Sequence, residues 1–205
     1  MKNSGNLLER LKILPHCSKD SVQQLGMQLG LSPASIDTYI SRFLGRRQLY
    51  QLKKGLYVSA DFLEKNRHDV SYTFYLANIL RKPSYVSSWA ALQYYDLTTE
   101  AIQTVTSVTP KVTRNYQTKA GAFSYQSINE ELFNGFSLGK GAFEFFIATP
   151  SKALFDLVYF RTRQFRSVTP QNVAPLVGEL RIDFEEMETA EQEKFHTMLA
   201  PYSHE

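Results

Sequence analysis

The sequence predicts an α+β fold built from two domains, residues 1–60 and residues 61–205. The chain begins with segments whose apolar residues recur at helical spacing, and a stretch rich in Thr, Val, Tyr and Phe follows between residues 102 and 128. Helical spacing then returns after residue 150. At 205 residues the chain is long enough for each of two domains to bury its own core.

The first domain is predicted to begin with three helices. The second helix starts after Ser18 as its N-cap and stops at Gly30. The third has Ser32 as its N-cap and Pro33 at its first helical position, and it runs to about Arg46. The first helix is indicated by an apolar stripe formed by Leu7, Leu8, Leu11 and Leu14.

The third helix has two contrasting faces. Its inward stripe consists of Ile36, Ile40, Phe43 and Leu44. Since successive residues of a helix are about 100° apart, the opposite face is left to Ser35, Thr38, Arg42 and Arg46. This outer face is therefore short, polar and cationic.

Two short alternating runs, LYQL and LYVS, follow the third helix and predict a β-hairpin. Lys53, Lys54 and Gly55 supply its polar turn. Three helices followed by a hairpin match a winged helix-turn-helix domain, in which the third helix reads DNA and the hairpin forms the wing.

Charge along the chain supports a nucleic-acid partner for this domain. Residues 1–59 carry nine Lys or Arg against three acids, whereas the remainder of the chain is net acidic. Such asymmetry indicates that the basic part contacts a polyanion. We expect Tyr39 and Tyr57 to pack rather than to contact phosphate. The candidate DNA-binding residues are Ser35, Thr38, Arg42, Arg46, Arg47, Lys53 and Lys54.

The second domain is predicted to be a larger α+β unit. Residues 59–69 indicate a linker or connecting helix, and two core helices follow, the second capped by Ser87 or Ser88. Residues 102–128 and the run FEFFIAT predict a small antiparallel sheet. A helix is predicted to begin at Pro150. The tail from Pro170 is predicted to form surface helices whose last residues fray.

The sequence predicts no catalytic residues, no metal site and no cofactor. The run GFSLGKGAF is not a phosphate-binding loop, because Gly135 is one residue too close to Gly139 and Gly141 replaces the Ser or Thr that would hold magnesium. Asp156, flanked by apolar residues, is expected to be a hydrogen-bonded structural acid. The paired acids Glu130–Glu131 and Glu185–Glu186 are interpreted as solvated surface.

The expected location is the cytoplasm, without membrane contact. No run of eighteen apolar residues is present, and Glu9, Arg10 and Lys12 interrupt the start of the chain, so no signal peptide is indicated. The single cysteine, Cys17, cannot form an internal disulfide and is expected to be a buried thiol.

Five segments in this order resemble the AbiEi family, the antitoxins and transcriptional regulators of bacterial abortive-infection (type IV) toxin–antitoxin systems. The resemblance covers roughly residues 18–163, and the tail after about Arg166 departs from the family pattern. The segments are KKGLYV, PSYVSSWAALQYYDL, VTSVTPKVTRNYQTKAGAFSYQSI, ELFNGF and ATPSKALFDLVYFR.

The resemblance implies a repressor that binds double-stranded operator DNA upstream of its own operon, through the seven candidate residues of the matching helix and wing. It also implies that the second domain acts as an antitoxin in phage defence. That domain would oppose a cognate nucleotidyltransferase-like toxin, in many cases without a stable complex. No residue with a chemical role carries over to the second domain.

Two other functions fit the same residues. One is a DNA-processing enzyme, a nuclease or a nucleotide-modifying protein, that uses the winged helix for targeting. The other is a protein-interaction module whose winged helix no longer binds DNA. The enzyme requires ionisable groups converging in a pocket of the second domain, and the interaction module predicts no salt-sensitive DNA binding.

Overall fold

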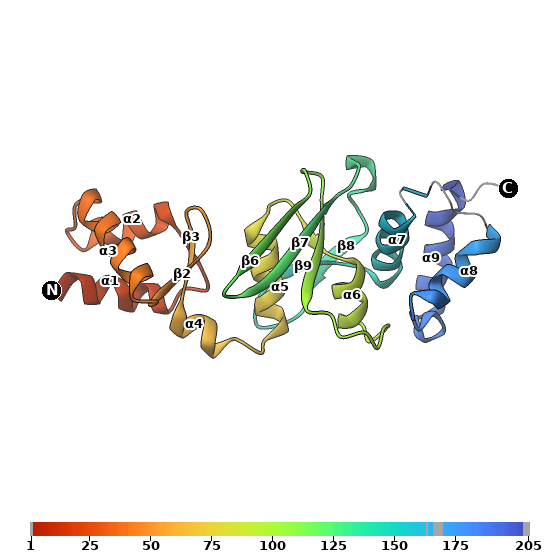
Figure 1. Cartoon of the computed structure of the whole chain (residues 1–205), viewed down its shortest axis with the longest axis horizontal. Coiled ribbons are helices and arrows are strands. Elements are labelled where there is room, and N and C mark those ends of the chain that lie inside the picture. Colours follow the sequence, from red (N-terminus) through yellow and green to blue (C-terminus); the bar gives the residue numbers. More distant parts are fainter. Residues whose placement is uncertain (1, 163, 166–169, 203–205) are drawn as a thin grey trace.

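The computed structural model describes residues 2–162, 164–165 and 170–202. Its elements are arranged along one long axis, with the N-terminal helices at one end, a six-stranded sheet in the middle and the C-terminal helices at the other end (Figure 1). Helices and strands are mixed along the chain, so the predicted α+β class is confirmed.

The N-terminal unit contains three helices and a three-stranded antiparallel sheet in the order β1-β3-β2. The elements occur at the predicted positions, with a two-residue strand added before the second helix. They are α1 (Lys2–Lys12), β1 (Cys17–Ser18), α2 (Lys19–Gln28), α3 (Pro33–Gly45), β2 (Leu49–Lys53) and β3 (Leu56–Ser59).

Local hydrogen bonds explain where α2 and α3 begin. The Ser18 side chain accepts a hydrogen bond from the Ser21 backbone N–H, and Ser32 does the same for Ser35. These caps satisfy N–H groups that have no partner inside the helix. The two helices approach closely at Gly26, where any added Cβ would lie 2.5 Å from Ile36. Any larger residue at this crossing would have to displace the Ile36 side chain.

The β2–β3 hairpin is shared between two hydrophobic cores. Leu49 and Tyr57 belong to the core of the three helices, whereas Leu52, Leu56 and Val58 belong to the core of the second unit. Alternate residues of a strand point to opposite faces, so one hairpin can serve both cores. The hairpin thus packs on one side against α1–α3 and on the other against the rest of the chain.

Polar contacts also join the two units. The Tyr72 hydroxyl donates to the Pro15 carbonyl at 2.8 Å, and the Tyr75 hydroxyl lies 2.6 Å from Nδ1 of His16. Burial lowers the pKa of His16, and the nearby Lys82 lowers it further. A neutral imidazole is therefore favoured at this junction near neutral pH.

The second unit begins with helices and continues into the large sheet. The predicted connecting segment is a short helix, α4 (Ala60–Lys65), and the core helices α5 (Val70–Leu80) and α6 (Ser88–Tyr94) follow. The sheet has the order β6-β7-β5-β4-β9-β8. Its strands are β4 (Tyr85–Val86), β5 (Thr104–Thr109), β6 (Arg114–Thr118), β7 (Gly121–Ser127), β8 (Phe136–Gly139) and β9 (Phe145–Ala148).

The expectation of a small antiparallel sheet is wrong for this unit. The sheet has six strands, and two of its pairings are parallel, β5 with β7 and β4 with β9. Parallel partners are set by how a chain returns across a sheet rather than by local pattern. β4 contributes two residues between two helices, too short to show an alternating pattern.

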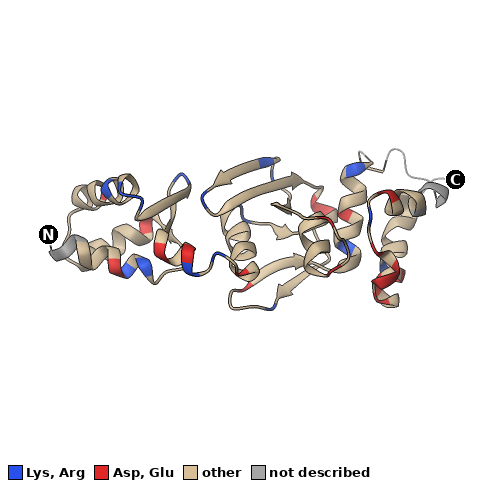
Figure 2. Ribbon diagram, turned by 60° about the horizontal axis from the view of Figure 1, so that its bottom comes forward, with Lys and Arg blue, Asp and Glu red and all other residues tan. Residues whose placement is uncertain are grey.

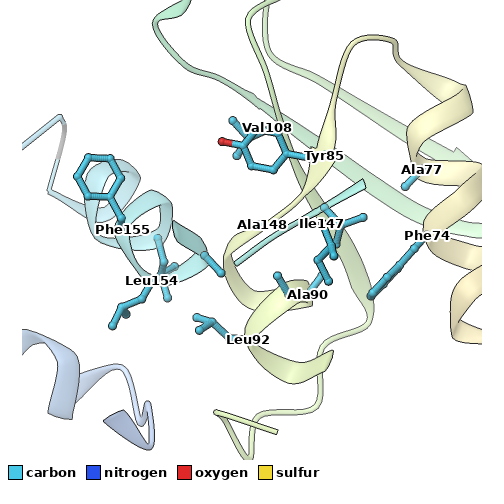
Figure 3. Close-up of a cluster of buried hydrophobic side chains, with 14 of the residues drawn as sticks. Phe74, Ala77, Tyr85, Ala90, Leu92, Val108, Ile147, Ala148, Leu154 and Phe155 are labelled. Atoms are coloured by element: carbon cyan, nitrogen blue, oxygen red, sulfur yellow. The ribbon is translucent and has the colours of Figure 1, made fainter. Parts of the chain in front are cut away.

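Helices cover both faces of this sheet. On one face, the Tyr125 hydroxyl of β7 donates to the Ala77 carbonyl of α5 at 2.6 Å. On the other face lie α6 and α7 (Pro150–Arg161), and the Ala90 N–H of α6 donates to Thr106 of β5. Figure 3 shows the apolar side chains between these layers, including Phe74, Ile147 and Leu154.

The remaining elements form the C-terminal end. They comprise α8 (Pro170–Glu179), α9 (Thr189–Leu199) and the short 3₁₀ helices η2 (Phe184–Glu186) and η3 (Ala200–Tyr202), whereas the 3₁₀ helix η1 (Glu130–Leu132) lies between β7 and β8. The predicted helices of the tail are therefore present, and its expected frayed end, residues 203–205, lies outside the described residues. No described helix has the length and apolar character needed to cross a bilayer.

Glu191 fixes α9 against the start of α7. Its carboxylate accepts from the backbone N–H of Ser151 at 3.0 Å and from the Ser151 hydroxyl at 2.6 Å, and Lys194 lies 2.6 Å away. Burial raises the pKa of Glu191, but these hydrogen bonds and Lys194 lower it by more, so the net shift is downward. The ionised carboxylate therefore stabilises the docking of α9.

We expect Glu191→Gln to reduce the sensitivity of the fold to acid. A depressed pKa in the folded state means that stability is present above the unfolded value, 4.5, and is lost as pH falls through the folded pKa. The difference in unfolding free energy between wild type and Glu191→Gln should therefore shrink below about pH 4.5. Urea unfolding at several pH values measures it; a difference that grows on acidification would contradict this role.

Candidate nucleic-acid interface

The outer face of α3 is exposed, as its spacing predicts. Thr38, Arg42 and Arg46 are exposed, whereas Ile36 and Ile40 are buried against the other helices. Ser35 is half-buried, and its hydroxyl lies 2.9 Å from that of Ser32 at the helix start. Ser35 is thus engaged in capping, and the guanidinium groups dominate the exposed face.

The Arg42 guanidinium lies over an aromatic ring of the same helix. Its guanidinium carbon lies 5.9 Å from the centre of the Tyr39 ring, and that ring stacks on Phe43. Such cation–π contact limits the positions that the guanidinium samples. Tyr39 is half-buried and Tyr57 is buried in the core of the three helices, so both pack as predicted.

Arg46 and Arg47 close the C-terminal end of α3. Arg47 adopts a left-handed conformation with φ of 57°, and the Gln48 N–H donates to the Phe43 carbonyl. This is the geometry of a Schellman cap, which turns the chain sharply away from the helix. Both arginines are exposed, and no ion pair to an acid is present for them among the described residues.

The two lysines of the hairpin turn have different environments. Lys54 is exposed, next to Gly55, whose φ of +75° the turn requires. The Lys53 ammonium instead donates to the Leu80 carbonyl at the end of α5, at 2.6 Å, and Lys53 is half-buried. Lys53, a candidate DNA-binding residue, is therefore already bound within the protein, because the second unit packs against that side of the hairpin.

A contact between α2 and α3 was missed by sequence reasoning. Asp37, the only acid of α3, lies 3.2 Å from the Lys19 ammonium and accepts a hydrogen bond from Gln23 at 3.0 Å. Its negative charge is thereby compensated beside the exposed arginines. Lys19 and Asp37 are eighteen positions apart, so only the packing of α2 on α3 pairs them.

Charge differs between the two ends of the molecule. Lys and Arg outnumber Asp and Glu on the N-terminal helices and the hairpin, whereas acids gather on the C-terminal helices (Figure 2). Between residues 170 and 202 the chain has seven acids and two bases. An approaching polyanion is therefore attracted to the N-terminal end and repelled by the C-terminal end.

The second unit contains a buried polar cluster around Asp156. Its carboxylate accepts hydrogen bonds from the Lys152 ammonium at 2.7 Å, the Ser87 hydroxyl at 2.6 Å and the Tyr85 hydroxyl at 3.0 Å. The side chains of Lys152 and Asp156 are 1% and 0% exposed. Burial raises the pKa of Asp156, while Lys152 and the two hydroxyls act in the opposite direction. Asp156 is thus hydrogen-bonded as predicted, and it is enclosed by protein.

The cysteine and the paired acids lie apart from this cluster. Cys17 is buried, and burial raises the pKa of its thiol to about 12, so a reactive thiolate is disfavoured at neutral pH. The acids Glu130, Glu131, Glu185 and Glu186 are all exposed, as expected for solvated surface. Among the residues that the structure describes, no group of three potential ligands could hold a metal ion.

Comparison with known proteins adds no assignment: neither a protein-family model nor a curated protein sequence matches this chain.

Proposed function

We propose that the protein is a DNA-binding transcriptional autorepressor and the antitoxin of a bacterial abortive-infection toxin–antitoxin system, countering a nucleotidyltransferase-like toxin. The DNA-binding part is supported by the order of elements from α1 to β3 and by a sheet order of β1-β3-β2. A winged helix has this arrangement. In a winged helix bound to DNA, the second helix of the helix-turn-helix motif enters the major groove, and α3 occupies that position in this chain.

One observation carries the proposal: the exposed face of α3 presents Thr38, Arg42 and Arg46, and Arg47 after the helix and Lys54 in the hairpin turn are exposed as well. A guanidinium can hold guanine through two hydrogen bonds, whereas a lysine at the hairpin tip reaches phosphate. Lys53 is not needed for this role, since the remaining cations form the surface without it.

The antitoxin part of the proposal is supported by the resemblance of the sequence to the AbiEi family. Four of the five resembling segments belong to the second unit, where they include β4, α6, strands β5 to β7, η1, and the end of β9 with α7. We assign them a non-catalytic role because Lys152 and Asp156, the ionisable pair at this centre, are enclosed in the core.

The alternative is a DNA-processing enzyme that uses the N-terminal unit for targeting. Such an enzyme needs ionisable groups that a substrate can reach. The Asp156 cluster satisfies its own hydrogen bonds and is closed to solvent, so the regulator is favoured.

Gel-shift titration of the full chain tests the DNA-binding part. The probes are the duplex immediately upstream of its own coding sequence and a shuffled duplex of the same length, each at several salt concentrations. We expect tighter binding to the upstream duplex and affinity that falls with salt. Equal affinity for both duplexes, independent of salt, would overturn the repressor. Co-expression with a neighbouring nucleotidyltransferase gene tests the antitoxin part, with restored growth as the expected result.

The two hairpin lysines should respond differently to mutation. Lys54→Ala should weaken binding to all duplexes similarly and lower the salt slope by about one, because one phosphate contact is lost. Lys53→Ala should leave the salt slope unchanged, since its ammonium is bound to the Leu80 carbonyl. The same gel-shift series measures both. A lower slope for Lys53→Ala with no change for Lys54→Ala would reverse the assignment.

A further inference from the structure

We propose that the groove between α8 and α9 is a docking site for a basic amphipathic helix of a partner protein. This surface lies at the opposite end of the molecule from α3, and the inference does not depend on DNA binding. The groove is a cavity of about 630 Å³ whose apolar floor is formed chiefly by Val173, Val177, Phe195 and Leu199.

The floor provides apolar contact without a polar anchor. Val173 and Val177 are one helical turn apart on α8, and Phe195 and Leu199 are one turn apart on α9. Two such rows of side chains form the floor of a groove that can receive the apolar stripe of a third helix. Because no buried charged side chain lines the floor, a small polar ligand would find few partners there.

The rim of the groove is acidic. Asp183, Glu185 and Glu186 line it, all three are exposed, and none of them forms an ion pair within the described part of the chain. The two bases of this region are already paired, Arg181 with Glu100 and Lys194 with Glu191. The rim therefore carries uncompensated negative charge, which favours a partner with lysines or arginines on both sides of its apolar stripe.

The rim is also held in place by the central sheet unit. Thr98 and Ile182 form a β-bridge, and the Asp183 N–H donates to the Leu97 carbonyl at 3.0 Å. These bonds tie the segment before η2 to the loop after α6. An ordered rim reduces the entropy lost when a partner binds.

Gly178 allows the groove to be blocked without disturbing the fold. It lies in α8 and lines the groove, and a Cβ added there would meet nothing within 4 Å. Replacing glycine inside a helix by leucine also improves helix propensity. Gly178→Leu should therefore fill the groove while the melting temperature is kept or raised.

The experiment uses the full chain and a fluorescent helical peptide of leucine and lysine, about fourteen residues or four turns long, with leucine at helical spacing. Fluorescence anisotropy gives its Kd. We expect wild type to bind, Gly178→Leu to lose binding, and Glu185→Lys with Glu186→Lys to weaken it about tenfold, as expected for opposed rim charges. The same peptide with glutamate in place of lysine should bind at least about tenfold more weakly.

The chain offers a matched control for the charge reversal. Glu130 and Glu131 are adjacent exposed acids on another 3₁₀ helix, η1, away from the groove. Reversing them changes net charge equally and should leave peptide affinity unchanged. Equal loss in this control, or unchanged binding by Gly178→Leu, would overturn the proposal. So would light scattering that shows a wild-type dimer converted to monomers by Gly178→Leu, because the occupant would then be a second copy.

Discussion

Replacing Asp156 by alanine should lower the free energy of unfolding by about 3–5 kcal/mol, the cost expected when one partner of a buried ion pair is removed. The substitution leaves the Lys152 ammonium in the core without its carboxylate, and the hydroxyls of Ser87 and Tyr85 lose their acceptor. An unpaired charge in a low-dielectric interior lowers the stability of the folded state, because the charge is no longer hydrated by water. Urea unfolding followed by circular dichroism measures the change.

Two further variants distinguish this explanation from simple loss of side-chain volume. Lys152→Met together with Asp156→Leu removes both charges and should recover part of the lost stability, since the buried charge no longer remains. Asp183→Ala, at an exposed acid, should change the unfolding free energy by less than about 0.5 kcal/mol. A cost below about 1 kcal/mol for Asp156→Ala would show that the cluster does not hold a buried charge pair.

Arg42→Ala should reduce the preference for operator over shuffled DNA by about 1–3 kcal/mol, provided that Arg42 makes a bidentate contact to guanine. Arg42 occupies the middle of the exposed face of α3, with its guanidinium over Tyr39. Loss of that group removes a base contact, so affinity for the operator falls more than affinity for other sequences. Competitive gel shifts with both duplexes measure the ratio.

Arg10→Ala is the matched control for this variant. Arg10 is an exposed arginine of the same unit, but it lies on α1, so its loss lowers the net charge equally. We expect Arg10→Ala to keep the preference for the operator. Equal effects of Arg10→Ala and Arg42→Ala would indicate a general charge effect, and α3 would then not be the reading element.

Much of the N-terminal unit was predictable because its signals are local. Ser18 and Ser32 cap the helices that they were expected to cap, and the apolar stripe of α3 faces inward. The candidate site follows from the same periodicity, since a fixed angle per residue determines that Arg42 and Arg46 are exposed when Ile36 and Ile40 are buried. For these residues the sequence alone gives both position and orientation.

Lys53 shows why the rest of the site could not be predicted. Next to Lys54 in a polar turn, it has the same local pattern and the same expected role. Its ammonium reaches the Leu80 carbonyl, twenty-seven positions away, because the second unit packs against the hairpin. The partners of Asp37 and Asp156 likewise come from elements that meet only when the chain folds.

The sequence by itself determined the α+β class, the starts of α2 and α3 and the polar face of α3, because caps and apolar periodicity depend on residues a few positions apart. Tertiary structure alone decided that the hairpin serves two cores, that the large sheet contains parallel pairings, and that α8 and α9 enclose an acid-rimmed groove. These features depend on contacts between distant segments, whose free energy comes from burying surfaces together. No local pattern encodes which surfaces those are.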